Sequence, residues 1–216
     1  MRRGEVRDRL LEAALRLCAT DGVGATTIRG VIRECGANLN AIHYHFGSWP
    51  KLVSELVTAA MQGLNDERFE RLDALTDLTS DDVPASALAV LEAGYAPLFR
   101  RAAGPDWQST RAGLVIVQQL RFDPSGLGLD VLDHHSAEFV RRIEARLGAF
   151  LPHRPAELRA GMQAFNAAAW DIALRPDTLE RTRSAQSPER ALKRITAPLF
   201  RFGVGGLLAM SKGMAK

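Results

Sequence analysis

The sequence lacks the features that mark disulfide-rich, zinc-binding and membrane-spanning proteins. Its 216 residues include only two cysteines, Cys18 and Cys35, whose number and spacing fit neither a disulfide framework nor a set of zinc ligands. No apolar run reaches the roughly 18 residues that a membrane-spanning helix needs. The basic N-terminus leads into a periodic helix rather than into the apolar core of a signal peptide. We therefore expect a cytoplasmic protein with reduced thiols, no metal site and no membrane contact.

Strand patterns and catalytic motifs are missing as well. Apolar and polar residues nowhere alternate over the length of a strand, and there is no internal repeat or low-complexity tract. The glycines of residues 203–206 lie within a late apolar helix, so they do not form a phosphate-binding loop. Helical periodicity covers nearly the whole chain. This pattern predicts an all-α fold without a cofactor.

The positive charge is concentrated at the N-terminal end. The formal net charge is +3, and residues 1–50 hold seven arginines against five acids, while the rest of the chain holds 21 basic and 20 acidic side chains. Four of the arginines fall within the first nine residues. Such an arm can neutralise DNA phosphates, although an ordinary solvated terminus has the same composition and is by itself the commoner case.

Three short helices are expected within the first 46 residues. Apolar residues at Val6, Leu10, Ala14 and Leu17 follow the spacing of one buried stripe, and Gly22 ends that helix. Thr26-Thr27 offers an N-cap for a second helix, Ile28 to Glu34. Gly36 breaks it, and Asn38 caps a third helix after a turn of about three residues. This is the helix-turn-helix arrangement, over about residues 27–46.

The remainder is expected to form a second domain of longer helices. Ser48 caps a fourth helix with Pro50 in its first turn, where proline is tolerated. Further helices are predicted at 84–102, 107–121, 128–150, 155–174 and 188–209, with Pro97 and Pro198 expected to kink or shorten theirs. We divide the chain into a DNA-binding domain, residues 1–52, and a helical domain, residues 53–216.

The third helix carries an unusual concentration of polar side chains for its length. Ile42 and Phe46 are four residues apart, so they share one face and are expected to pack on the first two helices. The opposite face, around Asn40 and Tyr44 with His43 beside it, is free to enter a major groove. The alternative is a buried or capping cluster without a ligand. A shared metal is disfavoured because His43 and His45, two apart, point to different sides of the helix.

Each exposed side chain suits a particular part of DNA. Asn40 matches adenine bidentately, and His43 reaches a base edge or a phosphate. Tyr44 and His45 suit phosphate oxygens, as does the start of the second helix at Thr27. Leu39 lies at the core edge or against a thymine methyl. The predicted DNA contacts are Thr27, Arg29, Asn38, Leu39, Asn40, His43, Tyr44, His45 and Lys51.

Several segments resemble the TetR family of bacterial transcriptional regulators. They are residues 11–17, Asp21-Gly22, Ala25 to Arg29, Gly36 to Asn38 and Ile42 to Ser48. The resemblance implies an all-α homodimer in which an N-terminal domain binds a palindromic operator. It also implies a C-terminal domain that binds a small effector, and repression that ends when the effector binds. The family commonly has a lysine directly after the Gly-Ser pair. Here Trp49 and Pro50 follow Ser48, so we expect that phosphate contact either to be weaker or to move to Lys51. Ile32 stands where the family often has a small residue.

The C-terminal domain gives weaker signals. Pocket candidates are the aromatic, sulfur and imidazole side chains Phe99, Trp107, His134, Met162, Phe165 and Trp170, although ordinary core positions use the same residue types. We place the dimer interface on helices 155–174 and 188–209, which carry small and apolar residues such as Ala164 and Leu199. The acid-histidine cluster Asp133-His134-His135 leaves an all-α enzyme as an alternative, but adjacent residues on a helix do not converge on one ion. A helical dimer without DNA binding is a third possibility.

Overall fold

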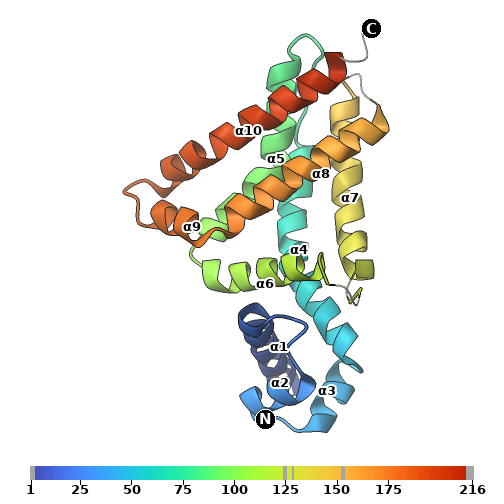
Figure 1. Ribbon diagram of the computed structural model, residues 1–216, viewed down its shortest axis with the longest axis vertical. Helices are drawn as coiled ribbons and strands as arrows, with labels where there is room; N and C mark the ends of the chain where they lie inside the picture. The colour runs from blue at the N-terminus through green and yellow to red at the C-terminus, as the bar shows by residue number, and fades with distance from the viewer. Residues whose placement is uncertain (1–2, 124–125, 128, 152–153, 213–216) are drawn as a thin grey trace. The chain divides into compact units, whose positions relative to one another are not determined.

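The computed structural model describes residues 3–123, 126–127, 129–151 and 154–212, and all of its regular elements there are α-helices (Figure 1). The prediction of an all-α fold is therefore confirmed. None of the described helices is long and apolar enough to span a bilayer. The chain forms two compact units, Met1–Gly63 with Gln108–His135 and Leu64–Trp107 with Ser136–Lys216. The predicted boundary at residue 52 thus falls inside the first unit.

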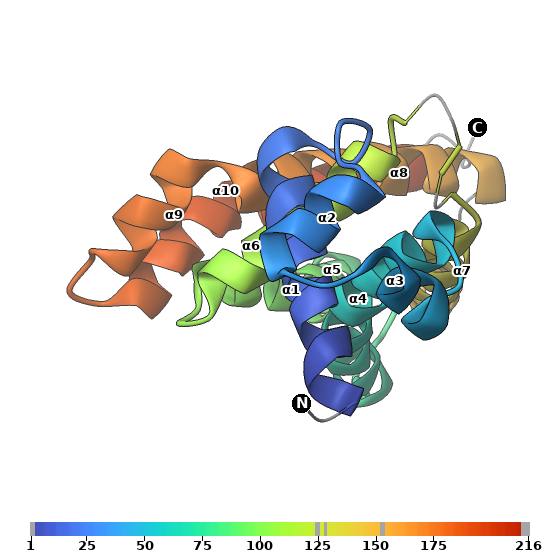
Figure 2. The same ribbon diagram turned by 90° about the horizontal axis from the view of Figure 1, so that it is seen from below.

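The first unit begins with three helices, α1 (Arg3–Asp21), α2 (Ile28–Cys35) and α3 (Leu39–His45), which Figure 2 shows from below. The stripe predicted for α1 is buried at Leu10 and Ala14, where no side-chain surface is exposed. Cys18 continues the stripe at 0% exposure, and Cys35 at the end of α2 is also buried. Both thiols are free, and they serve as small core residues.

Two later segments complete this unit. The first part of α4 (Trp49–Asp73) is packed closely by α6 (Trp107–Leu120), since a Cβ at Gly113 would lie 2.8 Å from Cβ of Ala60. The backbone amide of Val23, after α1, donates to Oε1 of Gln119 at 3.1 Å. Near the start of α7 (Leu129–Gly148), Nε2 of His135 lies 3.2 Å from Oγ1 of Thr58. These contacts explain why residues 108–135 belong with the helix-turn-helix.

The second unit is a bundle of longer helices. α5 (Val83–Ala103), α8 (Pro155–Leu174) and α10 (Pro188–Lys212) pack on one another, and α9 (Pro176–Arg183) joins the last two (Figure 1). Tyr95, Phe165 and Phe200 form a chain of ring contacts, with centroids 4.8 Å apart for the first pair and 6.2 Å for the second. α10 approaches closely because residue 203 is glycine, where a Cβ would lie 2.5 Å from Cε2 of Phe165.

The predicted set of helices lacks one. Between the predicted helices 155–174 and 188–209 the chain forms α9, which begins with Pro176 and has an acidic first turn at Asp177. Its sequence is almost entirely polar, so no apolar periodicity reveals it. The internal prolines do not shorten their helices, since α5 continues through Pro97 and α10 through Pro198. Burial of the surrounding turns, such as Leu98 and Leu199, compensates for the hydrogen bond that each proline removes.

Candidate DNA-binding interface and C-terminal pocket

The turn between α2 and α3 is defined by local capping. Oγ1 of Thr27 accepts a hydrogen bond from the amide of Gly30 at 3.1 Å, which caps α2. At the other end Gly36 has φ 64°, a left-handed conformation that favours glycine. Asn38 then caps α3, its Oδ1 accepting from the amide of Ala41 at 3.0 Å. The Asn38 side chain, predicted as a DNA contact, therefore has an intramolecular role in starting the recognition helix.

The two faces of α3 separate as the spacing predicts. Ile42 is 0% exposed and Phe46 4%, and both anchor α3 on the first two helices. Asn40 and His43 lie exposed on the other side, and Tyr44 is 61% exposed. A tyrosine that is so exposed contributes little to the core.

The other predicted DNA contacts differ in exposure. Thr27, Arg29 and Lys51 are exposed, whereas His45 is half-buried and its ring lies edge-on to Tyr44 with centroids 5.0 Å apart. The side chain of Leu39 lies outside the part that the structure describes. The individual contacts with DNA stay predictions.

His43 is oriented by a hydrogen bond within its own helix end. Its Nδ1 lies 3.1 Å from the carbonyl oxygen of Gly47. Because a carbonyl oxygen only accepts, Nδ1 carries the proton, and the neutral ring is left with Nε2 as an acceptor. His43 therefore uses Nδ1 to cap the end of its own helix. Nε2 is the ring nitrogen that is left to accept a hydrogen bond from a DNA base.

Arginines of α1 form ion pairs and hydrogen bonds with other helices of the first unit. Arg7 forms an ion pair with Glu55 of α4, and Arg9 donates to the carbonyl oxygen of Cys35 at the end of α2. Arg16 pairs with Glu34 at 2.9 Å. The guanidinium of Arg7 also lies 5.4 Å from the ring centroid of Phe46. The expectation of a solvated or phosphate-binding arm does not describe Arg7 and Arg9; Arg2 and the side chain of Arg3 lie outside the described residues.

The exit from α3 places Lys51 beside the recognition helix. Gly47 has φ 78°, and Oγ of Ser48 accepts from the amide of Lys51 at 3.4 Å, so Ser48 caps α4 as predicted. A Cβ at Gly47 would lie 3.9 Å from Nζ of Lys51. The ammonium of Lys51 therefore lies beside the turn that ends α3, and its contact with a phosphate stays a prediction.

Residues 10–56 match the family model of bacterial regulatory proteins of the tetR family. The N-terminal segment is a tetR-family DNA-binding domain. Over these residues the resemblance drawn from the sequence is confirmed. No curated protein matches the chain.

Solved structures of tetR-like regulators share the fold over nearly the whole chain. The fatty acid degradation regulator FadR from Bacillus halodurans aligns with a TM-score of 0.63 and 15% identity, covering 96% of this chain and 98% of its own. The ketosteroid regulator KstR2 of Mycobacterium tuberculosis gives 0.59 and 18%, covering 93% of each chain. NalD of Pseudomonas aeruginosa, a secondary repressor of a multidrug efflux pump, gives 0.57 and 20%, covering 92% and 95%. At these identities the likeness establishes the fold of the second unit and not its ligand.

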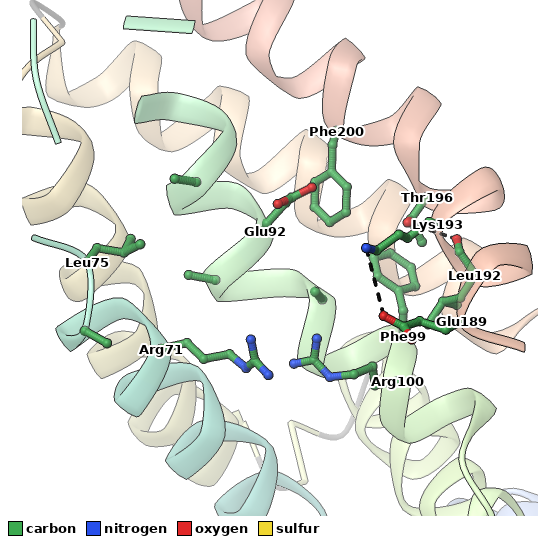
Figure 3. Close-up of a pocket in the computed structure, with 14 residues that line it drawn as sticks. Arg71, Leu75, Glu92, Phe99, Arg100, Glu189, Leu192, Lys193, Thr196 and Phe200 are labelled. Carbon is green, nitrogen blue, oxygen red and sulfur yellow. Dashed lines mark hydrogen bonds and ion pairs between the residues drawn. The ribbon is translucent and has the colours of Figure 1, made fainter. Parts of the chain in front are cut away.

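Beyond the tetR-family domain, the second unit contains a pocket of about 450 Å³ between α4, α5 and α10 (Figure 3). Phe99, Phe200 and Leu192 supply apolar surface. Charged groups line the same pocket, and Figure 3 shows the guanidinium groups of Arg71 and Arg100 facing each other. A volume of this size and a mixed lining are typical of small-molecule sites.

One carboxylate next to this pocket binds three arginines. Glu67 accepts from Arg100 at 2.7 Å and lies 3.3 Å from both Arg71 and Arg101. Burial by itself would raise the pKa of Glu67, but the hydrogen bond and charge of Arg100, with the charges of Arg101 and Arg71, outweigh it and lower the pKa. The cluster keeps an excess of positive charge. Sequence reasoning missed the cluster because Arg100 and Arg101 are 33 and 34 residues from Glu67.

The predicted ligand-binding side chains are scattered. Phe99 lines the pocket; Met162, Phe165 and Trp170 are buried in the bundle; Trp107 is half-buried at the start of α6; and His134 is exposed. None of the last five lines this pocket. Their role in effector binding stays a prediction.

The acid-histidine cluster on α7 does not converge on a site. His135 contacts Thr58, while Asp133 and His134 are exposed. Burial, followed by the neighbouring charge of His134, lowers the pKa of His135. Within the described residues no group of three or more histidine, cysteine or acidic side chains is placed to hold a metal ion.

Proposed function

We propose that the protein is a homodimeric transcriptional repressor that binds a pseudo-palindromic operator and is released by a small-molecule effector. The observation that carries this proposal is the division of α3 into a buried face, Ile42 and Phe46, and an exposed face, Asn40, His43 and Tyr44. A recognition helix needs this division. The protein acts in the cytoplasm, where the operator lies.

The exposed face supplies both base and phosphate contacts. The amide of Asn40 matches the donor and acceptor of adenine in the major groove, and the free Nε2 of His43 accepts from an adenine or cytosine amino group. Tyr44, Lys51 and the amides at the start of α2 behind Thr27 hold phosphates and set the register. Arg29, exposed in the first turn of α2, adds a cation on the same side of the turn.

An exposed apolar stripe on α10 supports a dimer. Phe202 is 69% exposed, and the residues that share its face are small or apolar: Pro198, Gly205, Gly206 and Ala209, all exposed. The neighbouring helix α8 exposes Ala160, Ala164 and Ala167. Two such faces from two copies form a self-complementary four-helix contact. Leu199, expected in that contact, is only 7% exposed and belongs to the core of its own chain.

The dimer fixes the geometry of the operator. Two recognition helices related by a two-fold axis read half-sites about 34–36 Å apart. The effector is proposed to bind in the second unit, which contains a pocket of about 450 Å³. α4 begins directly after α3 and continues into the second unit, so binding to that unit changes the affinity for DNA by a coupling free energy of typically about 1–3 kcal/mol.

Selection of bound sequences from a random DNA pool tests the proposal. We expect a pseudo-palindrome with half-sites one helical turn apart, bound by one dimer with an affinity that falls steeply with salt. Replacing Asn40 by alanine should relax the sequence preference, while the exposed aromatic Phe122 of the same unit serves as a matched control when changed to alanine. Enrichment of no sequence, or binding that is insensitive to salt, would refute a role in operator recognition.

A further inference from the structure

A single arginine interrupts the buried stripe of α4. The apolar positions of this stripe are Val57, Met61, Leu64 and Leu72, each at most 4% exposed. Arg68 lies between the last two, four residues from each, and is 2% exposed. A charged residue at such a position is rare unless a partner compensates for its lost hydration.

The surroundings of Arg68 compensate only part of its guanidinium. Nη1 donates to Oδ1 of Asn65 at 3.3 Å. The guanidinium carbon lies 4.2 Å from the ring centroid of Phe139 and 5.7 Å from that of Tyr95. Nε and Nη2 are buried and have no hydrogen-bond partner, and no acidic side chain of the described chain pairs with the group.

The charge persists at neutral pH. Burial lowers the pKa of Arg68 to about 10, while Tyr95 opposes that change. At pH 7 the side chain is therefore still protonated, and it brings a positive charge into the core of the second unit. The two aromatic faces attract this charge, but they do not accept the hydrogens of Nε and Nη2.

The two unpaired nitrogens form one edge of the guanidinium. Nε–H and Nη2–H point in parallel along the same side, and this edge fits the two oxygens of one carboxylate. A carboxylate supplies one negative charge and two coplanar hydrogen-bond acceptors. Within the part of the chain that the structure describes, Arg68 has no ion-pair partner of this kind and two donors without acceptors. A phosphate is tetrahedral and more highly charged, so a single buried arginine leaves most of its oxygens without donors.

We infer that Arg68 is the anion-binding residue for an effector that carries a single carboxylate on an apolar body, with that body lying against the rings of Tyr95 and Phe139. None of these three residues lines the pocket of about 450 Å³, so the site at Arg68 is not that pocket. This inference rests on the proposed function, since it names the chemical class of the effector. Ligand binding then neutralises a buried charge on α4, the helix that begins directly after the recognition helix.

Substitution of Arg68 by methionine separates this role from a structural one. A buried charge without a full set of partners destabilises the empty protein, whereas an apolar side chain of similar length fills the same space. We expect Arg68→Met to unfold at the same temperature as the wild-type chain or higher, and to lose its response to carboxylates. Arg68→Lys keeps the charge without the paired donors and should bind weakly. Arg141→Met, at a side chain 72% exposed on α7, is the matched control.

The probes are octanoate and 2-naphthoate, each compared with its neutral amide, together with inorganic phosphate. Thermal unfolding and titration calorimetry of the full-length chain measure binding. Carboxylates should raise the wild-type Tm by about 5–10 °C at a hundredfold excess over Kd, and the amides and phosphate should not. Arg68→Met should weaken carboxylate binding at least about 30-fold.

Three results would overturn the inference: equal shifts with carboxylate and amide, undiminished carboxylate binding by Arg68→Met, or no response of the wild-type chain to either carboxylate. A fourth is a large loss of stability in Arg68→Met with unchanged ligand response, which assigns the arginine to the fold. DNA binding, measured in parallel on the selected operator, separates the two proposals. A chain that binds DNA without a carboxylate response refutes only the effector class, and an Arg68-dependent carboxylate response without DNA binding refutes only the repressor.

Discussion

The Nδ1 atom of His43 lies 3.1 Å from the carbonyl oxygen of Gly47, one turn further along the chain. This contact fixes which nitrogen of the ring faces outward from α3. It also allows the capping role of His43 to be separated from its role toward DNA, because asparagine reproduces Nδ1 and glutamine reproduces Nε2.

His43→Asn should preserve the contact with Gly47 and weaken operator binding by about 10-fold, the equivalent of one lost hydrogen bond. His43→Ala should weaken binding similarly and also lower the thermal stability of the first unit. Fluorescence anisotropy with a labelled operator and thermal unfolding measure the two effects. If His43→Asn binds DNA as the wild-type chain does, Nε2 makes no contact with the operator.

Tyr44→Phe should weaken operator binding by about 5-fold without changing the preferred sequence. The ring remains and only the hydroxyl donor to a phosphate is lost, a hydrogen bond of about 1 kcal/mol. The measurement is the binding constant on the operator and on single-base variants of it. Phe122→Ala, at a comparably exposed aromatic, should change neither. A shifted sequence preference in Tyr44→Phe would instead place the hydroxyl at a base edge.

Phe202→Glu should convert the dimer into a monomer. A charge at the centre of the exposed stripe of α10 is buried without a partner when two copies associate, which costs several kcal/mol. Light scattering after size-exclusion chromatography measures the mass. Operator affinity should fall together with dimerisation because only one half-site is then held. A dimer that persists in Phe202→Glu places the interface elsewhere, and Phe122→Glu controls for the added charge.

Glu67→Gln should make the free energy of unfolding less dependent on pH in the acid range. The folded-state pKa of Glu67 is lowered, so the folded chain releases this proton more readily than the unfolded chain. The stabilisation that the ionised Glu67 gives to the folded chain is fully present above the unfolded-state pKa of about 4.3. It is lost as the pH falls through the lower folded-state pKa. Chemical unfolding between pH 3 and pH 7 measures the slope. Glu70→Gln, an exposed acid on the same helix, should leave the profile unchanged. An equal slope in Glu67→Gln would mean that the three arginines do not depend on this carboxylate.

The helix-turn-helix could be predicted from the sequence because its determinants are local. Thr27 and Asn38 cap helices within three residues, and the four-residue spacing of Ile42 and Phe46 defines a face without reference to the rest of the chain. The helix α9 escaped prediction because its residues carry no apolar period. The pocket depends on helices far apart in sequence, and no local pattern brings Glu67 beside Arg100.

Arg68 could be predicted from the sequence only in part. Its place between Leu64 and Leu72 can be read from the periodicity of α4, and a charge at that place is a departure from the pattern. Whether this arginine is buried depends on Tyr95 and Phe139, which lie on two other helices. A search for charged residues inside apolar stripes would have found the position but not its partners.

The burial of the two cysteines gives the molecule an internal reporter. Burial raises the pKa of the Cys18 thiol, with the hydrogen bond from Thr26 opposing it and the charge of Asp21 adding to it. Such a thiol reacts slowly with alkylating reagents until the surrounding helices separate. Cys18 and Cys35 are the only cysteines in the chain and both belong to the first unit. The rate of thiol alkylation in the native chain therefore measures the opening of the unit that contains the helix-turn-helix, without a contribution from the other unit.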